Sequence, residues 1–138
     1  MTSDERLREL IRLRMQQATD TLHEAEILLT EHAGRGAINR AYYAMFYTVL
    51  AVLATRGRGS SKHSGAIALF DREFVKPGDL SSELSRSLHM AFERRQQADY
   101  GELAELDEPA VVKTVEEAEV FMRKVGDYMR AEGLLPSN

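Results

Sequence analysis

The sequence contains no cysteine and no long apolar run, and each absence excludes a class of protein. Without cysteine the chain can form neither a disulfide framework nor a thiolate metal site. The longest apolar segment, 41–54, is interrupted by Thr48 and falls short of the roughly 18 residues that a membrane-spanning helix needs. The N-terminus is charged from Asp4 onward, unlike a secretory signal. We therefore expect a cytoplasmic protein that makes no membrane contact.

Several catalytic and metal-binding signatures are also absent. The glycine-containing loop at 56–63 lacks the glycine–lysine–serine spacing of a Walker loop. His23 and His32 are not spaced as a pair of helical metal ligands, and no histidine–carboxylate cluster stands out. No serine lies in a nucleophile elbow. The sequence therefore predicts no metal and no cofactor, and nucleophilic hydrolases can be set aside.

Alternating strand patterns never develop, and helical periodicity runs along almost the whole chain instead. The first helix is predicted from Ser3 or Asp4, either of which can cap it, to about residue 32. Gly34 and Gly36 are expected to end it. Its apolar side chains recur in steps of three and four and form one stripe, which consists of Leu7, Ile11, Met15, Ala18, Leu22, Ala25 and Leu29.

Four further helices are predicted at 37–54, at 62–74, at 81–100 and from Pro109 to the C-terminal region. Gly101 suits the C-terminal cap of the helix at 81–100, and an acidic loop at 102–108 precedes Pro109. The segment after about residue 132 is expected to fray. The helix at 37–54 is apolar on every face, which indicates a buried central element. We therefore predict an all-α fold, an antiparallel up-down helical bundle of about five helices in a single domain, 1–138.

The helix at 81–100 carries an unusual charged pair. Its apolar stripe through Leu84 and Leu88 continues in phase to Arg95 and Asp99, so helical spacing places both charges on the inward face. Buried charges are unfavourable unless they are paired and hydrogen-bonded. Arg95 and Asp99 are therefore either a structural ion pair or the wall of a polar cleft.

A second group of polar residues is a candidate for the same cleft. Asn39 and Arg40 begin the otherwise apolar helix at 37–54, where they either face solvent or share the cleft with Arg95 and Asp99. In the latter case the hydroxyl donors would be Tyr43 and Tyr100.

The loop that precedes the helix at 62–74 is a candidate anion site. Lys62 and His63 lie at the start of that helix, where backbone N–H groups and the helix dipole favour phosphate. Residues 35–95 carry 10 basic and 5 acidic side chains, although the whole chain has a net charge of −4. His63 could act as a general acid or base. The alternative is a solvated basic loop.

Three segments together resemble one family of helical proteins. They are NRAYYAMF at 39–46, KHSG at 62–65 and RRQQADYG at 94–101. In this order and spacing they resemble a subfamily of HEPN domains, over about residues 5–130. That resemblance implies a helical bundle that forms homodimers and, in many members, a metal-independent ribonuclease. Such members often act as toxins beside a minimal nucleotidyltransferase antitoxin.

The resemblance also implies roles for individual residues. The family signature is an arginine and, after four to six intervening residues, a histidine at the end of a late helix, with two copies facing each other across the dimer cleft. Arg94 or Arg95 matches the arginine: the family spacing favours Arg94 and the apolar stripe favours Arg95. Asp99 stands where the histidine is expected, so His63 would have to replace it. Tyr100 is placed similarly to a tyrosine that partner nucleotidyltransferases modify with AMP.

The sequence leaves three interpretations open. In the first, the cleft binds RNA or a nucleotide and possible cleavage uses Arg95 or Arg94 for the phosphate and His63 or Asp99 as proton acceptor. In the second, the same residues form a non-catalytic module that binds a nucleotide or docks the partner. In the third, the charged stripe is an ion pair at the dimer seam. Residues assigned to binding are Asn39, Arg40, Tyr43, Lys62 and Tyr100.

Overall fold

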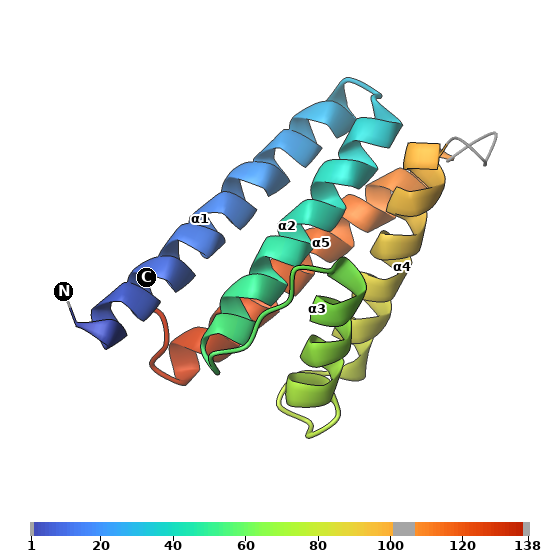
Figure 1. Ribbon diagram of the computed structural model, residues 1–138. Coiled ribbons are helices and arrows are strands. Elements are labelled where there is room, and N and C mark those ends of the chain that lie inside the picture. The colour runs from blue at the N-terminus through green and yellow to red at the C-terminus, as the bar shows by residue number, and fades with distance from the viewer. Residues whose placement is uncertain (1, 101–106, 137–138) are drawn as a thin grey trace.

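The computed structural model describes residues 2–100 and 107–136 and consists of helices packed in an antiparallel bundle (Figure 1). No strand occurs in these two ranges, which confirms the predicted all-α fold. The elements in chain order are α1 (Ser3–Thr30), α2 (Gly34–Ala54), α3 (His63–Phe70), the π-helical turn η1 (Asp71–Val75), α4 (Ser82–Tyr100) and α5 (Glu108–Ala131).

Helix α2 is the central helix of the bundle, as its all-round apolar surface predicts. It packs most extensively against α1 and also contacts α3, α4 and α5 (Figure 1). Thirteen of its residues are buried, and Tyr42, Met45 and Leu53 have no exposed surface. By length and composition alone α2 could cross a membrane, but 67% of its most apolar window is buried inside the bundle. The protein's own helices therefore account for its apolar faces.

Both ends of α1 differ in detail from the prediction. Thr2 caps α1, with its side chain accepting from the Glu5 backbone N–H, so neither Ser3 nor Asp4 is the cap. At the other end α1 stops at Thr30, and His32 adopts a φ of 58° that closes the helix in place of a glycine.

Gly34 and Gly36 were predicted to end α1, but they lie in the first turn of α2. The reason is close packing between helices. A Cβ at Gly36 would lie 3.1 Å from Leu28 of α1, and a Cβ at Gly34 would lie 3.3 Å from Val111 of α5. The glycines therefore allow α2 to begin close to both neighbours.

The helix predicted at 62–74 is not one continuous α-helix. Helix α3 ends at Phe70 and the chain continues as the π-helical turn η1, in which the Lys76 N–H donates to the Asp71 carbonyl at 2.8 Å. Phe70 and Phe74 are both buried. The turn preserves the inward direction of both rings while the hydrogen-bond pattern changes between them.

Arg56 holds the loop before α3 against the rest of the bundle. Its guanidinium lies 4.0 Å from the centre of the Phe74 ring and donates to the Asp79 carboxylate at 3.1 Å. It also donates to the Glu73 carbonyl and to the Tyr128 hydroxyl of α5. The loop that delivers His63 to the start of α3 is thereby anchored on two other elements.

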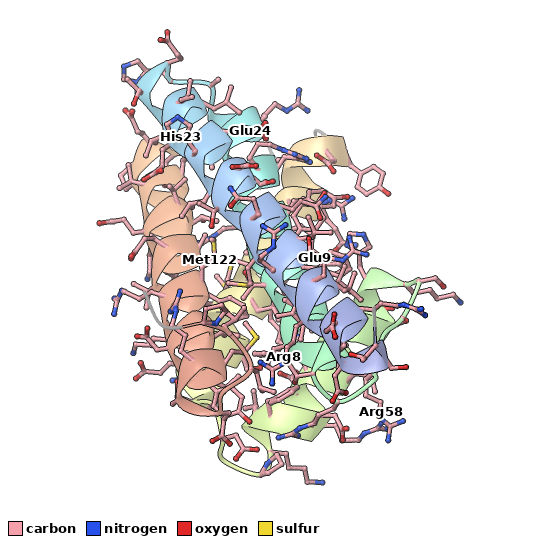
Figure 2. All side chains as sticks on the ribbon, turned by 90° about the vertical axis from the view of Figure 1, so that its left-hand side faces the viewer. Arg8, Glu9, His23, Glu24, Arg58 and Met122 are labelled. Atoms are coloured by element: carbon pink, nitrogen blue, oxygen red, sulfur yellow. The ribbon has the colours of Figure 1, made fainter. Side chains whose placement is uncertain are left out.

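Helix α5 begins as the sequence predicts, with Pro109 in its first turn. Asp107 caps it by accepting from the Ala110 N–H at 2.9 Å. Its buried side chains, which include Val115, Phe121 and Val125, pack toward the centre. Met122 lies where α5 faces α1 (Figure 2). After Gly133, at a φ of 73°, Leu134 donates its N–H to the Met129 carbonyl at 2.7 Å. The proposed cap at Gly101 and the acidic loop up to residue 106 lie outside the described residues.

Candidate functional site

Helices α2 and α4 bring Tyr43, Arg95 and Asp99 together. Arg95 and Asp99 lie one turn apart on α4, with the Arg95 Nε 3.0 Å from the Asp99 Oδ2. A terminal nitrogen of Arg95 donates to the Tyr43 hydroxyl at 3.3 Å. The Arg95 side chain keeps 22% of its surface exposed and that of Asp99 keeps 36%. The pair is thus half-buried at the edge of the bundle.

The contacts of Arg95 differ from those of a fully paired structural arginine. Its guanidinium carbon lies 5.5 Å from the Tyr42 ring centre and 5.4 Å from that of Tyr43, within range of cation–π attraction. The Nε atom is buried and makes no well-aligned hydrogen bond, even though Asp99 is 3.0 Å away. A short distance without the right angle is an ion pair but a poor hydrogen bond. The attraction between Arg95 and Asp99 is therefore mainly electrostatic, and the 22% of the Arg95 side chain that is exposed is the part that a ligand could contact.

His63, at the start of α3, packs against the aromatic rings of Tyr42, Tyr43 and Phe46 in α2. Its Nδ1 is 2.7 Å from the Tyr42 hydroxyl, and its ring stacks on Phe46 with centroids 4.1 Å apart. Burial and the nearby charge of Arg95 lower the pKa of His63 below its ordinary value of 6.5. The imidazole is therefore neutral at physiological pH, and in the tautomer whose Nδ1–H donates to the Tyr42 hydroxyl the Nε2 lone pair is available to accept a proton.

Tyr42 is a site residue that sequence reasoning missed. Its ring is fully buried and its hydroxyl is hydrogen-bonded to His63, while burial raises the pKa of Tyr42 above its ordinary value. The sequence placed it among the core residues of the central helix. The available signal was the hydroxyl itself, because a buried tyrosine hydroxyl needs a hydrogen-bond partner.

Asn39 and Arg40 lie one turn before Tyr43 and close to it. Two nitrogens of Arg40 donate to the Asn39 Oδ1, at 3.1 and 2.8 Å, and a third lies 3.5 Å from Glu24. Figure 2 shows Glu24 projecting from α1 on the side where α2 and α4 lie. The Arg40 guanidinium also lies 5.1 Å from the Tyr43 ring centre. Two arginines thus flank one tyrosine.

Arg94 does not take part in this cluster. It points to α5, where it donates to the Thr114 hydroxyl at 2.7 Å and lies 3.6 Å from Glu117. Its side chain is only 16% exposed. The sequence allows either Arg94 or Arg95 as the arginine of the site, and Arg95 is the one that lies beside Tyr43 and His63. The apolar stripe favours Arg95 and the family spacing favours Arg94, and which of the two faces a dimer cleft stays a prediction.

Lys62 and Tyr100 lie at the margins of the site. Lys62 is the exposed N-cap residue of α3. Its backbone N–H donates to the hydroxyl of Ser60, two positions earlier, at 3.2 Å. Tyr100 ends α4 with 76% of its surface exposed. Among the side chains that the structure describes, no three histidine, aspartate or glutamate residues gather closely enough to hold a metal ion.

The lowered pKa of His63 gives a testable pH dependence of stability. The unfolded chain takes up a proton on this histidine first as the pH falls below about 6.5. The stability contributed by neutral His63 is therefore fully present above that pH and is lost as the pH falls through the folded-state pKa. Urea unfolding between about pH 7.5 and pH 5 should show a steeper loss for the wild type than for His63→Gln. Parallel curves for the two proteins would contradict the assignment.

Comparison with known proteins identifies the family. A model of the HEPN domain matches residues 11–128. A UPF0332 protein of Thermotoga maritima is 43% identical over 107 residues, which cover 78% of this chain and 81% of that protein. A candidate toxin of Methanocaldococcus jannaschii, MJ0142, is 32% identical over 128 residues, which cover 93% of this chain and 86% of the relative.

A second candidate toxin of the same organism, MJ0605, is 32% identical over 119 residues, which cover 86% of this chain and 88% of the relative. The family model and these relatives each match most of the chain. They agree with the resemblance carried by the three sequence motifs. The chain belongs to the HEPN domain family.

Proposed function

We propose that this chain is a toxin-like HEPN protein that binds RNA at Arg95 and cleaves it without a metal. The observation that carries the proposal is the arrangement of a charged arginine and a neutral histidine around the same two tyrosines. The names of MJ0142 and MJ0605 support a toxin-like role. The protein would act in the cytoplasm as a homodimer whose two copies share the cleft.

Cleavage would use the 2′-hydroxyl of the RNA as the nucleophile. His63 accepts the proton of that hydroxyl, and the 2′ oxygen forms a bond to phosphorus as the bond to the 5′ oxygen breaks. Arg95 stabilises the negative charge that develops on the phosphoryl oxygens. The leaving 5′ oxygen takes a proton from the Tyr43 hydroxyl or from water, and the products are a 2′,3′-cyclic phosphate and a 5′-hydroxyl end.

His63 takes the place of the histidine that the family signature has after the arginine. Asp99 stands at that position here, and a carboxylate would repel the phosphate if it were not already paired with Arg95. The ring of His63 lies 5.5 Å from that of Tyr43, which itself contacts Arg95. His63 is preferred over Asp99 as the proton acceptor because the carboxylate is held in the ion pair with Arg95, whereas the imidazole is neutral.

The proposed partner is a minimal nucleotidyltransferase encoded separately. Tyr100 is highly exposed at the end of α4, so a modifying enzyme could reach its hydroxyl. Addition of AMP there would place extra negative charge near the site and hinder RNA binding. The partner would thereby control the activity.

The proposal is tested by incubating the purified protein with labelled RNA in EDTA. The wild type should generate fragments ending in 2′,3′-cyclic phosphate, and His63→Ala should bind RNA without cutting it. RNA that is bound but intact in both samples would favour the second candidate, a non-catalytic binding module. Absence of binding by the wild type would contradict both.

A further inference from the structure

A cavity of about 400 Å³ opens beside the Arg95 cluster, between the start of α2 and the end of α4. Its walls include Arg35, Asn39 and Arg40 from the first two turns of α2 and Asp99 from α4. Asp99 belongs to both places, because it also pairs with Arg95. The cavity is therefore continuous with the site proposed for cleavage.

The cavity is rich in hydrogen-bond donors that are held in place. Arg35 donates from Nε to the Ala98 carbonyl at 2.9 Å, which fixes its guanidinium across the gap between the two helices. The Asn39 Oδ1 accepts from Arg40, so the Asn39 amide nitrogen remains as the donor side of that group. Guanidinium groups with an amide donor suit the oxygens of a phosphate.

The start of α2 adds to this preference for an anion. No side chain caps its N-terminus and its first turn contains no acidic residue. Arg35 lies in that first turn, where the positive end of the helix dipole disfavours a cation. A bound anion would offset both the dipole and the arginine.

Arg40 at the cavity and Arg95 at the cleavage site both lie near the Tyr43 ring, which limits the distance between the two places. The Arg40 guanidinium carbon lies 5.1 Å from the Tyr43 ring centre and that of Arg95 lies 5.4 Å from it, so their separation cannot exceed the sum of these distances. Nearby phosphates of one nucleic-acid strand can bridge such a span. Tyr43 between them offers an aromatic side chain of the kind that single-stranded RNA recognition uses.

We propose that the cavity lined by Arg35, Asn39 and Arg40 holds a second phosphate of the strand whose reacting phosphate lies at Arg95. The protein would therefore recognise single-stranded RNA of at least two phosphates rather than a mononucleotide. This inference rests on the proposed function and adds Arg35 to the residues that contact the substrate.

The acidic residues around the cavity do not oppose this assignment. Glu24 lies 3.5 Å from Arg40 and its side chain is 56% exposed, so this is a weak surface ion pair that a phosphate can replace. The charge of Asp99 is already offset by Arg95 at 3.0 Å. The phosphate would meet the cavity mainly through its arginines.

The test measures the affinity of fluorescently labelled 2′-O-methyl oligouridylate of ten nucleotides, which lacks the nucleophilic hydroxyl, and of a 2′-O-methyl uridine dinucleotide with one phosphate, at several salt concentrations. Arg35→Gln should weaken decamer binding about three- to tenfold and reduce the salt slope by about 0.7. It should leave dinucleotide binding unchanged. Arg35→Lys should keep most of the slope because it retains the charge.

Arg12→Gln is the matched control, because it removes an equal charge from an exposed position of α1 where Arg12 pairs with Glu9. If Arg35→Gln behaves like Arg12→Gln while the wild type binds the decamer, the second subsite is refuted and the proposed function stands. If the wild type binds neither RNA, the proposed function fails and the subsite fails with it. Binding of ATP as tight as that of the decamer, with equal sensitivity to Arg35→Gln, would overturn recognition of a strand.

Discussion

Replacing Arg95 with methionine should weaken RNA binding about 10- to 100-fold and leave the folded state as stable as before. The loss of affinity follows because a charged contact to phosphate disappears. Stability should change by less than about 1 kcal/mol, because the half-buried guanidinium has a buried Nε without a hydrogen bond and is replaced by an apolar side chain of similar length. Asp99 stays partly exposed to water when its partner is removed. Fluorescence anisotropy and thermal unfolding at one protein concentration measure both effects.

The neighbouring substitution, Arg94→Met, should have the opposite pattern. Arg94 donates to Thr114 and lies beside Glu117 in a largely buried position, so its removal should cost about 1–2 kcal/mol. RNA affinity should stay within twofold of the wild type. A fall in melting temperature for Arg95→Met with unchanged RNA affinity would establish Arg95 as a structural ion pair instead.

Replacing Phe121 with alanine should lower the free energy of unfolding by about 3–5 kcal/mol. Phe121 of α5 is fully buried and its ring centre lies 5.5 Å from that of Phe70 in α3. This contact joins the short α3 to the long helices. The loss is a large part of the roughly 5–15 kcal/mol that holds a domain of this kind together. Denaturant unfolding followed by circular dichroism measures it.

Leu13→Ala provides the comparison on α1, because Leu13 keeps 51% of its surface exposed. Its effect on stability should stay within about 0.5 kcal/mol. A small effect at Phe121, similar to that at Leu13, would mean that α3 packs against α5 without contributing to the common core.

Periodicity was the most informative property of the sequence. It identified α2 as the central helix because apolar residues on every face can be buried only by surrounding helices. It also assigned Arg95 to the inner face of α4, where the structure has it beside Tyr43 of α2, while Arg94 packs against α5. Pro109 marked the start of α5 because its fixed φ suits a first helical turn.

Local rules failed where packing between distant segments decided the outcome. Gly34 and Gly36 read as helix terminators, but their lack of a side chain serves close contact with α1 and α5. Helix α3 changes to a π-helical turn at Asp71, whose carboxylate accepts from Ser85 and contacts His89 of α4. No periodic pattern within α3 contains that information.

The helices, the buried stripes and the family follow from the order of residues, because spacing along one chain fixes which side chains share a helical face. Which faces meet depends on the folded arrangement. It brought His63 against Tyr42, it separated Arg94 from Arg95, and it placed Arg35 beside Ala98, 63 positions away. These contacts depend on how α2, α3 and α4 cross, and that geometry arises from the packing of all the helices together.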